Sequence, residues 1–268
     1  MVAVALGASL GAWLVGSDRQ QRALYAAARL RRAIGTGKHR EIEMQLRREL
    51  ALAEAGEAVS LERQWMARAQ LGGLLVAEWR LEEAREIYGA DDSGLTPHLQ
   101  HLANYGRHEL ALLTDDPDEA RLEQIRVDME ACLEHVPPRY RETVARAWGA
   151  LEGLALARMG RANDAAPKLE ASLPSLDFNP ARVVYLFHLA QALEQIGDRE
   201  RAKAIYGEAS KAFPGTRLAS EAKARTLALG SGGAPDGLFR GMLPEAPAAA
   251  GGALVPLGER NGAREDEE

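Results

Sequence analysis

Three histidines lie between positions 98 and 108, and imidazole is the commonest side-chain ligand for metals in proteins. In a helix, His101 and His108 share one face, and His98 lies one turn away. A metal site also needs a carboxylate or another histidine on that face, and the adjacent Glu109 is poorly placed to supply it. The pattern predicts no metal site, and a metal- or ligand-binding helical enzyme domain is kept only as an alternative.

The remaining polar clusters have structural explanations. Asp91 and Asp92 lack the continuation of a calcium-binding loop, and the acidic stretch 115–119 is typical of a helix N-terminus. The single cysteine, Cys132, cannot form an intrachain disulfide and is predicted to be a small buried apolar residue. The sequence contains no phosphate-binding glycine loop, nucleophile elbow or paired-cysteine metal motif. We therefore predict no catalytic residue, no cofactor and no metal.

The composition favours helices along most of the chain. Alanine, leucine, glutamate and arginine dominate the 268 residues, and no segment alternates apolar and polar residues with a period of two. The formal net charge of -6 is spread over interspersed acidic and basic side chains, which disfavours a basic surface for nucleic acid. The sequence therefore predicts an all-α protein without a nucleic-acid partner.

Turn-forming residues interrupt the helical pattern at short intervals. Segments of about 12 to 20 residues, with apolar positions three or four apart, lie between the interruptions. Asp198 is predicted to cap the helix from Arg199 to Phe213, and Pro117 is predicted to begin another helix. The interruptions fall at Gly35–Gly37, Gly56, Glu78–Arg80, Gly89–Thr96, Thr114–Pro117, Pro137–Pro138, Gly160–Arg161, Pro174–Pro180, Gly197–Asp198 and Pro214–Gly215.

One stretch, Val183 to Pro214, combines two such segments in a pattern of small and large residues. Small residues fall where two helices must approach closely, large ones fill the space between them, and Gly197 permits a tight turn. This stretch closely resembles the tetratricopeptide repeat, whose period is about 34 residues. The residues that carry the resemblance are Leu186, Leu189, Ala190, Leu193, Gly197, Ala202, Tyr206, Ala209 and Pro214.

Two earlier stretches resemble the same repeat less completely. In the first, Arg68 replaces a large apolar residue and Trp79 takes the turn position. In the second, Gly149 and Glu152 occupy places that are usually apolar, so this helix pair is expected to be looser. The matching residues are Leu71, Gly72, Leu75, Ala84 and Tyr88 in the stretch 65–91, and Gly153, Leu156, Gly160, Ala165 and Leu169 in the stretch 146–174.

The resemblance implies a right-handed α-solenoid of about five antiparallel helix pairs, which ends in a capping helix. This repeat domain is expected to span residues 17–229, and the stretches 20–55 and 98–135 are assigned to it by context. Residues 230–268 are rich in glycine, alanine, proline and charge, and are predicted to be a disordered tail. One apolar island, Leu238–Leu243, interrupts that tail.

In this family the first helix of each pair lines a concave surface that usually binds peptides, so the resemblance implies a non-enzymatic protein-binding scaffold. The basic residues of the family's clamp for a C-terminal carboxylate are absent, which favours an apolar or helical partner segment. Packing of these side chains within the solenoid, and self-assembly of solenoids into a structural module, are the alternatives. The implied partner-binding residues are Met66, Ala69, Gly73, Ala147, Ala150, Leu154, Val184, Phe187 and Gln191.

Residues 1–16 carry no charged side chain and form one apolar run. At about 1.5 Å per helical residue the run covers roughly 24 Å, less than a hydrocarbon core of about 30 Å. A membrane anchor and a helix packed on the solenoid both fit this length. If the run spans a membrane, the basic residues that follow it predict that the solenoid faces the cytoplasm. The expected location is therefore the cytoplasm, with the cytoplasmic face of a membrane as the alternative.

Overall fold

The computed structural model describes residues 38–57, 59–177 and 179–231, together with a few positions between 29 and 36. All of these belong to one compact unit of the chain. The predicted apolar segment 1–16 lies outside the described residues, as does the predicted tail from residue 232 onward. Among the helices that are described, none is both long and apolar enough to cross a membrane.

Every regular element in this part of the chain is a helix, which confirms the all-α prediction. The helices also begin and end at the predicted interruptions, because those residues either cap a helix or cannot continue one. The helices are α3 (His39–Glu54), α4 (Leu61–Ala77), α5 (Leu81–Tyr88), α6 (Pro97–Thr114), α7 (Glu119–Glu134), α8 (Pro138–Arg158), α9 (Ala162–Ser172), the 3-10 helix η2 (Leu173–Leu176), α10 (Arg182–Gln195), α11 (Arg199–Ala212) and α12 (Arg217–Gly230).

Side-chain caps fix several of the helix ends. The carboxylates of Asp118 and Asp198 accept hydrogen bonds from backbone N–H groups three residues later, and so begin α7 and α11. The prediction that Pro117 begins a helix is wrong, because Pro117 precedes the capping Asp118. Pro97 and Pro138 instead lie in the first turns of α6 and α8, where a missing N–H group costs nothing.

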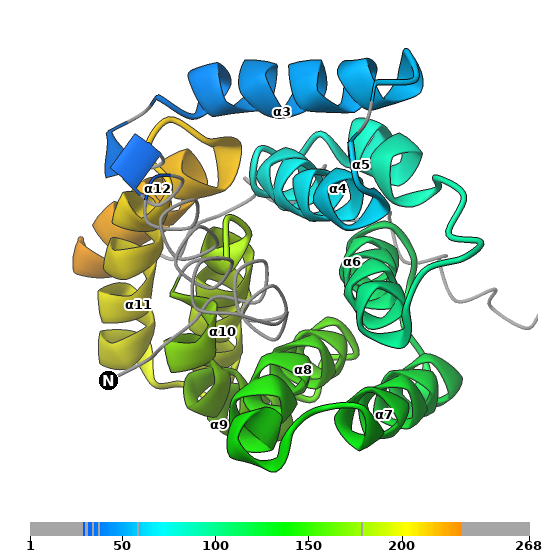
Figure 1. Ribbon diagram of the computed structural model, residues 1–268. Coiled ribbons are helices and arrows are strands. Elements are labelled where there is room, and N and C mark those ends of the chain that lie inside the picture. Colours follow the sequence, from blue (N-terminus) through cyan, green and yellow to red (C-terminus); the bar gives the residue numbers. More distant parts are fainter. Residues whose placement is uncertain are drawn as a thin grey trace, which may run out of the picture. The chain divides into compact units, whose positions relative to one another are not determined.

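Consecutive helices pack against each other in pairs: α4 with α5, α6 with α7, α8 with α9, and α10 with α11. Before and after these four described pairs, α3 packs on α4 and α12 packs on α11 (Figure 1). The first helices of the pairs also contact one another in succession, from α4 through α6 and α8 to α10, and α10 contacts α4. These four helices therefore surround a shared core.

A residue without a side chain brings the two helices of a pair together. A Cβ atom on Gly72 of α4 would lie 2.3 Å from the ring of Tyr88 in α5, and one on Gly153 of α8 would lie 2.8 Å from Leu169 in α9. Contacts this short exclude even an alanine unless the neighbour moves. Sixteen residues separate glycine and partner in both pairs, so the two pairs repeat one packing arrangement.

The other two pairs relate to this arrangement in different ways. In α10 and α11 the same spacing of sixteen separates Ala190 from Tyr206, and both side chains are fully buried. In α6, Gly106 follows Gly72 by 34 residues, and its Cβ atom would also lie 2.3 Å from Tyr88. The Tyr88 ring is therefore held between a glycine of α4 and a glycine of α6, which joins the first described pair to the second.

The expectation that α8 and α9 pack loosely is wrong. Ala165 and Leu169 of α9 are fully buried, and Gly153 of α8 leaves room for Leu169. Glu152 takes an apolar place in α8, but Lys168 of α9 and Arg126 of α7 both bond to its carboxylate, the latter at 2.7 Å. The departures from the repeat pattern are thus compensated by neighbouring side chains.

The turn between the two helices of a pair needs a residue in the left-handed conformation. Gly160 and Gly197 fill this place with φ of 75° and 86°, and Trp79 fills the equivalent place after α4 with φ of 65°. Trp79 is the one residue other than glycine with positive φ in the part of the chain that the structure describes. A bulky residue in this conformation costs on the order of 1–3 kcal/mol, so this turn is strained.

The first turn of α3 is tied to both ends of the array of pairs. Nε2 of His39 lies 2.9 Å from the carboxylate of Glu78, in the turn between α4 and α5. The same imidazole meets the ring of Phe213, just after α11, edge-on at a centroid distance of 5.0 Å. Phe213 is fully buried, so α3 links the beginning of the described array to its far end.

Two glycine substitutions should change stability in opposite directions. Gly197→Ala places a Cβ atom on a residue with φ of 86° and should lower the free energy of unfolding by about 1 kcal/mol or more. Gly207→Ala, in the middle of α11 with open space around it, should raise that free energy by roughly 0.5–1 kcal/mol, because alanine favours a helix. Urea unfolding measures both; equal effects would contradict the turn geometry.

Candidate functional site

Most of the predicted partner-binding residues are buried in the folded chain. Gly73, Ala147, Ala150, Leu154, Val184 and Phe187 are all buried, whereas Met66, Ala69 and Gln191 are partly exposed. The buried members lie on α4, α8 and α10, which are three of the four helices that surround the shared core. The structure therefore leaves only Met66, Ala69 and Gln191 of the predicted face reachable from solvent.

Phe187 lies in the core and not on the predicted binding face. The sequence places it on a binding face, but its side chain is only 1% exposed and its ring lies 5.5 Å, centroid to centroid, from that of Tyr206 in α11. An aromatic pair in this edge-on geometry is typical of a core contact between two helices. Phe187 therefore contributes to the packing of α10 on α11.

Of the three histidines, the two with described side chains, His101 and His108, contact different partners. The side chain of His98 lies outside the description. The ring of His101 stacks on that of His135 at 5.6 Å, whereas Nε2 of His108 bonds to the carboxylate of Asp128 at 2.7 Å. No group of three potential metal ligands occurs among the described residues.

The most unusual polar group of the core is the carboxyl of Glu109, which is 2% exposed. The phenol of Tyr185 in α10 donates a hydrogen bond to its Oε1 atom at 2.5 Å, and the hydroxyl of Tyr105 lies 2.8 Å from that of Tyr185. The ring of Trp148 meets that of Tyr105 edge-on at 5.7 Å. A hydrogen-bonded chain thus runs from α6 to α10 through the shared core.

Burial dominates the protonation of this group. Desolvation raises the pKa of Glu109 to about 7, although the hydrogen bond from Tyr185 lowers it. The phenols of Tyr88, Tyr105 and Tyr185 have pKa values well above the ordinary value, first because of burial and then because of the nearby carboxyl. No basic side chain of the described residues neutralises Glu109.

The sequence contains a signal for this cluster that the repeat pattern makes visible. Glu109 follows Gly106 by three residues, at the place where a buried leucine stands in the other described pairs. A carboxyl at a buried apolar position is a departure that usually marks strain or function. The leucines at the corresponding place are Leu75, Leu156 and Leu193.

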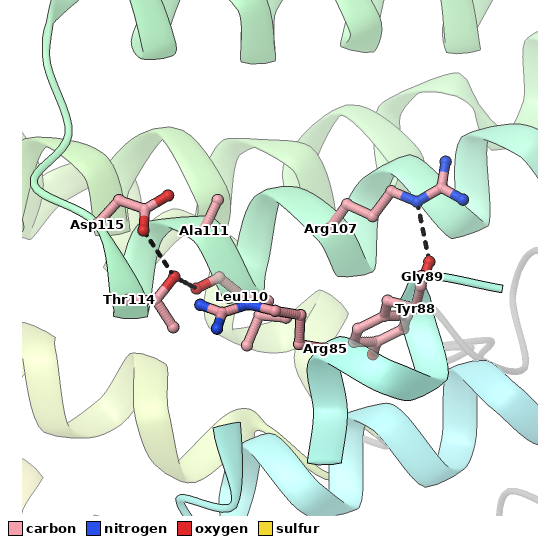
Figure 2. A pocket seen from close by; sticks show the side chains of 8 residues that line it. All are labelled: Arg85, Tyr88, Gly89, Arg107, Leu110, Ala111, Thr114 and Asp115. Atoms are coloured by element: carbon pink, nitrogen blue, oxygen red, sulfur yellow. Dashed lines mark hydrogen bonds between the residues drawn. The ribbon is translucent and has the colours of Figure 1, made fainter. Parts of the chain in front are cut away.

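A separate cavity of about 260 Å³ lies between α5 and α6 (Figure 2). Nε of Arg107 donates to the backbone carbonyl of Tyr88 at 3.0 Å, and its guanidinium pairs with Asp92 at 2.6 Å. Arg85, on the other side, pairs with Glu82 at 2.6 Å. Each arginine is paired with a carboxylate, so the cavity has no excess positive charge to bind an anion. Its lining residues are Arg85, Tyr88, Gly89, Arg107, Leu110, Ala111, Thr114 and Asp115.

No family model, no curated protein and no solved structure matches the chain.

Truncation of Phe187 should destabilise the whole fold. Phe187→Ala removes a buried ring that contacts Tyr206, and should lower the free energy of unfolding by roughly 3–5 kcal/mol. The matched control is Gln191→Ala, one turn further along α10 at a partly exposed position. It should change the free energy of unfolding by less than about 1 kcal/mol. Urea unfolding compares the two; a small effect of Phe187→Ala would restore this residue to the binding face.

Proposed function

We propose that the chain is a non-enzymatic scaffold of the tetratricopeptide type, a right-handed solenoid of about five helix pairs that holds another protein. The observation that carries this proposal is the close contact of a glycine with a large residue sixteen positions later, at Gly72 and Gly153. Ala190 and Tyr206 repeat this spacing with two fully buried residues. Stacked helix pairs of this kind form extended surfaces, whose common use is the binding of peptides or helices.

The partly exposed members of the predicted face support a binding surface on α4 and α10. Met66 and Ala69 lie one turn apart on α4, on the same side of the helix, and Gln191 lies on α10. A methionine side chain adapts to varied apolar surfaces, and an adjacent alanine allows a partner helix to approach closely. The partner is accordingly a protein segment with an apolar side, bound at a surface that begins on α4.

Charge introduced on α4 should prevent capture of the partner. The immobilised full chain is compared with the double variant Met66→Glu/Ala69→Glu in extracts of the source cells, and the proteins retained are quantified by mass spectrometry. A charge buried at an apolar contact costs several kcal/mol, so retention should fall at least about tenfold. Met44→Glu on α3, where the methionine is 66% exposed, is the control and should retain the partner.

Circular dichroism establishes that the variants keep their helices before the comparison is made. Equal retention by wild type and double variant contradicts the assignment of the surface to α4. Light scattering at several concentrations tests self-assembly as the rival function, because a mass that rises with concentration would favour a structural module over a scaffold for other proteins.

A further inference from the structure

Glu109 joins two helices that are separated in the array. It lies on α6 and Tyr185 on α10, and α8 stands between these helices and contacts both. The chain of hydroxyls from Tyr105 through Tyr185 to the Glu109 carboxyl is therefore a direct tie across the shared core. The other described pairs place a leucine at this position, which packs without a polar partner.

A second buried glutamate shows what the Glu109 site lacks. Glu152 on α8 is 7% exposed, and its carboxylate is bonded by both Arg126 and Lys168. Burial raises the pKa of Glu152, but the two basic partners outweigh burial and leave it below the ordinary value. Glu109 has phenols in place of cations, so its ionised form is poorly compensated.

We propose that Glu109 is a proton-controlled latch between α6 and α10: the neutral carboxyl keeps the two helices packed around Tyr185, and loss of the proton favours their local separation. Separation admits water to the carboxylate and so removes the cost of burying its charge. It also uncovers the side chain of Tyr185 on α10, which is fully buried in the closed state. This inference does not depend on the proposed function, because the latch can be measured without a partner.

The direction of the pH dependence follows from linkage. In the closed state the pKa of Glu109 is about 7, whereas an exposed carboxyl has its ordinary value of 4.5. The closed state therefore binds more protons between these values, and the opening equilibrium increases as the pH rises through them. Between pH 5.5 and 8 the increase from this group alone is roughly 30-fold.

Other titrating groups near the latch must be separated from this effect. Tyr88 of α5, Tyr105 of α6 and Tyr185 of α10 face the carboxyl, and burial keeps all three phenols neutral in this pH range. No charged side chain of α4, α7 or α8 in the described chain acts on Glu109. His108 and His188 have pKa values lowered by burial, so opening linked to them decreases as the pH rises.

Hydrogen exchange of the full chain at pH 5.5 and 8, corrected for the intrinsic pH dependence of exchange, tests the latch. The ratio of the opening constants of wild type and Glu109→Gln cancels the contribution of the histidines. We expect this ratio to rise roughly 30-fold between the two pH values for peptides of α6 and α10, and to stay constant for peptides of α12. An unchanged ratio in α6 and α10, or an equal rise in all helices, overturns the proposal.

Two further variants separate a latch from ordinary packing. Glu109→Leu installs the residue found at this place in the other described pairs, and should make opening of α6 and α10 independent of pH above 7. Tyr185→Phe keeps the ring but removes the donor that lowers the pKa of Glu109, so the pH of half-maximal change should move upward. An unmoved midpoint in Tyr185→Phe would show that the phenol does not control the proton, and would contradict the latch.

Discussion

The close approach of two helices at a residue with little or no side chain is the constraint on which the array depends. At Gly72 and Gly153 the partner side chain occupies the space that a Cβ atom would need, so the large residue and the glycine are matched. The equal spacing of sixteen residues then fixes which turn of the second helix meets which turn of the first. The turn residues Trp79, Gly160 and Gly197, all with positive φ, lie seven residues after Gly72, Gly153 and Ala190 respectively.

The two buried glutamates Glu109 and Glu152 have partners of different kinds. Glu152 is bonded by basic side chains of α7 and α9, so its charge is retained within the fold and links three consecutive helices. Among the described residues Glu109 is bonded only to a phenol, so its protonation is coupled to how tightly α6 and α10 close. Glu152 therefore supports the structure over a wide pH range, whereas Glu109 makes the structure responsive to pH.

Helix positions follow from local residues, and the sequence predicts them well. Asp198 caps α11, and Gly160 and Gly197 end the first helices of their pairs, because each effect acts within a few residues. Burial on the inner helices was beyond such reasoning, since the contact between α10 and α4 depends on how all the intervening pairs turn. The sequence therefore predicts a surface position for Phe187, which lies in the core.

The contact of His39 with Glu78 and Phe213 has a consequence for folding. An open solenoid, in which each repeat touches only its neighbours, can lose its terminal repeats one at a time. Here α3 contacts the end of the last described pair at Phe213, so α3 cannot separate from the array without breaking a contact that spans most of it. Unfolding is therefore expected to be a single cooperative transition, and closure of so long a loop makes folding slower than in an open array of equal length.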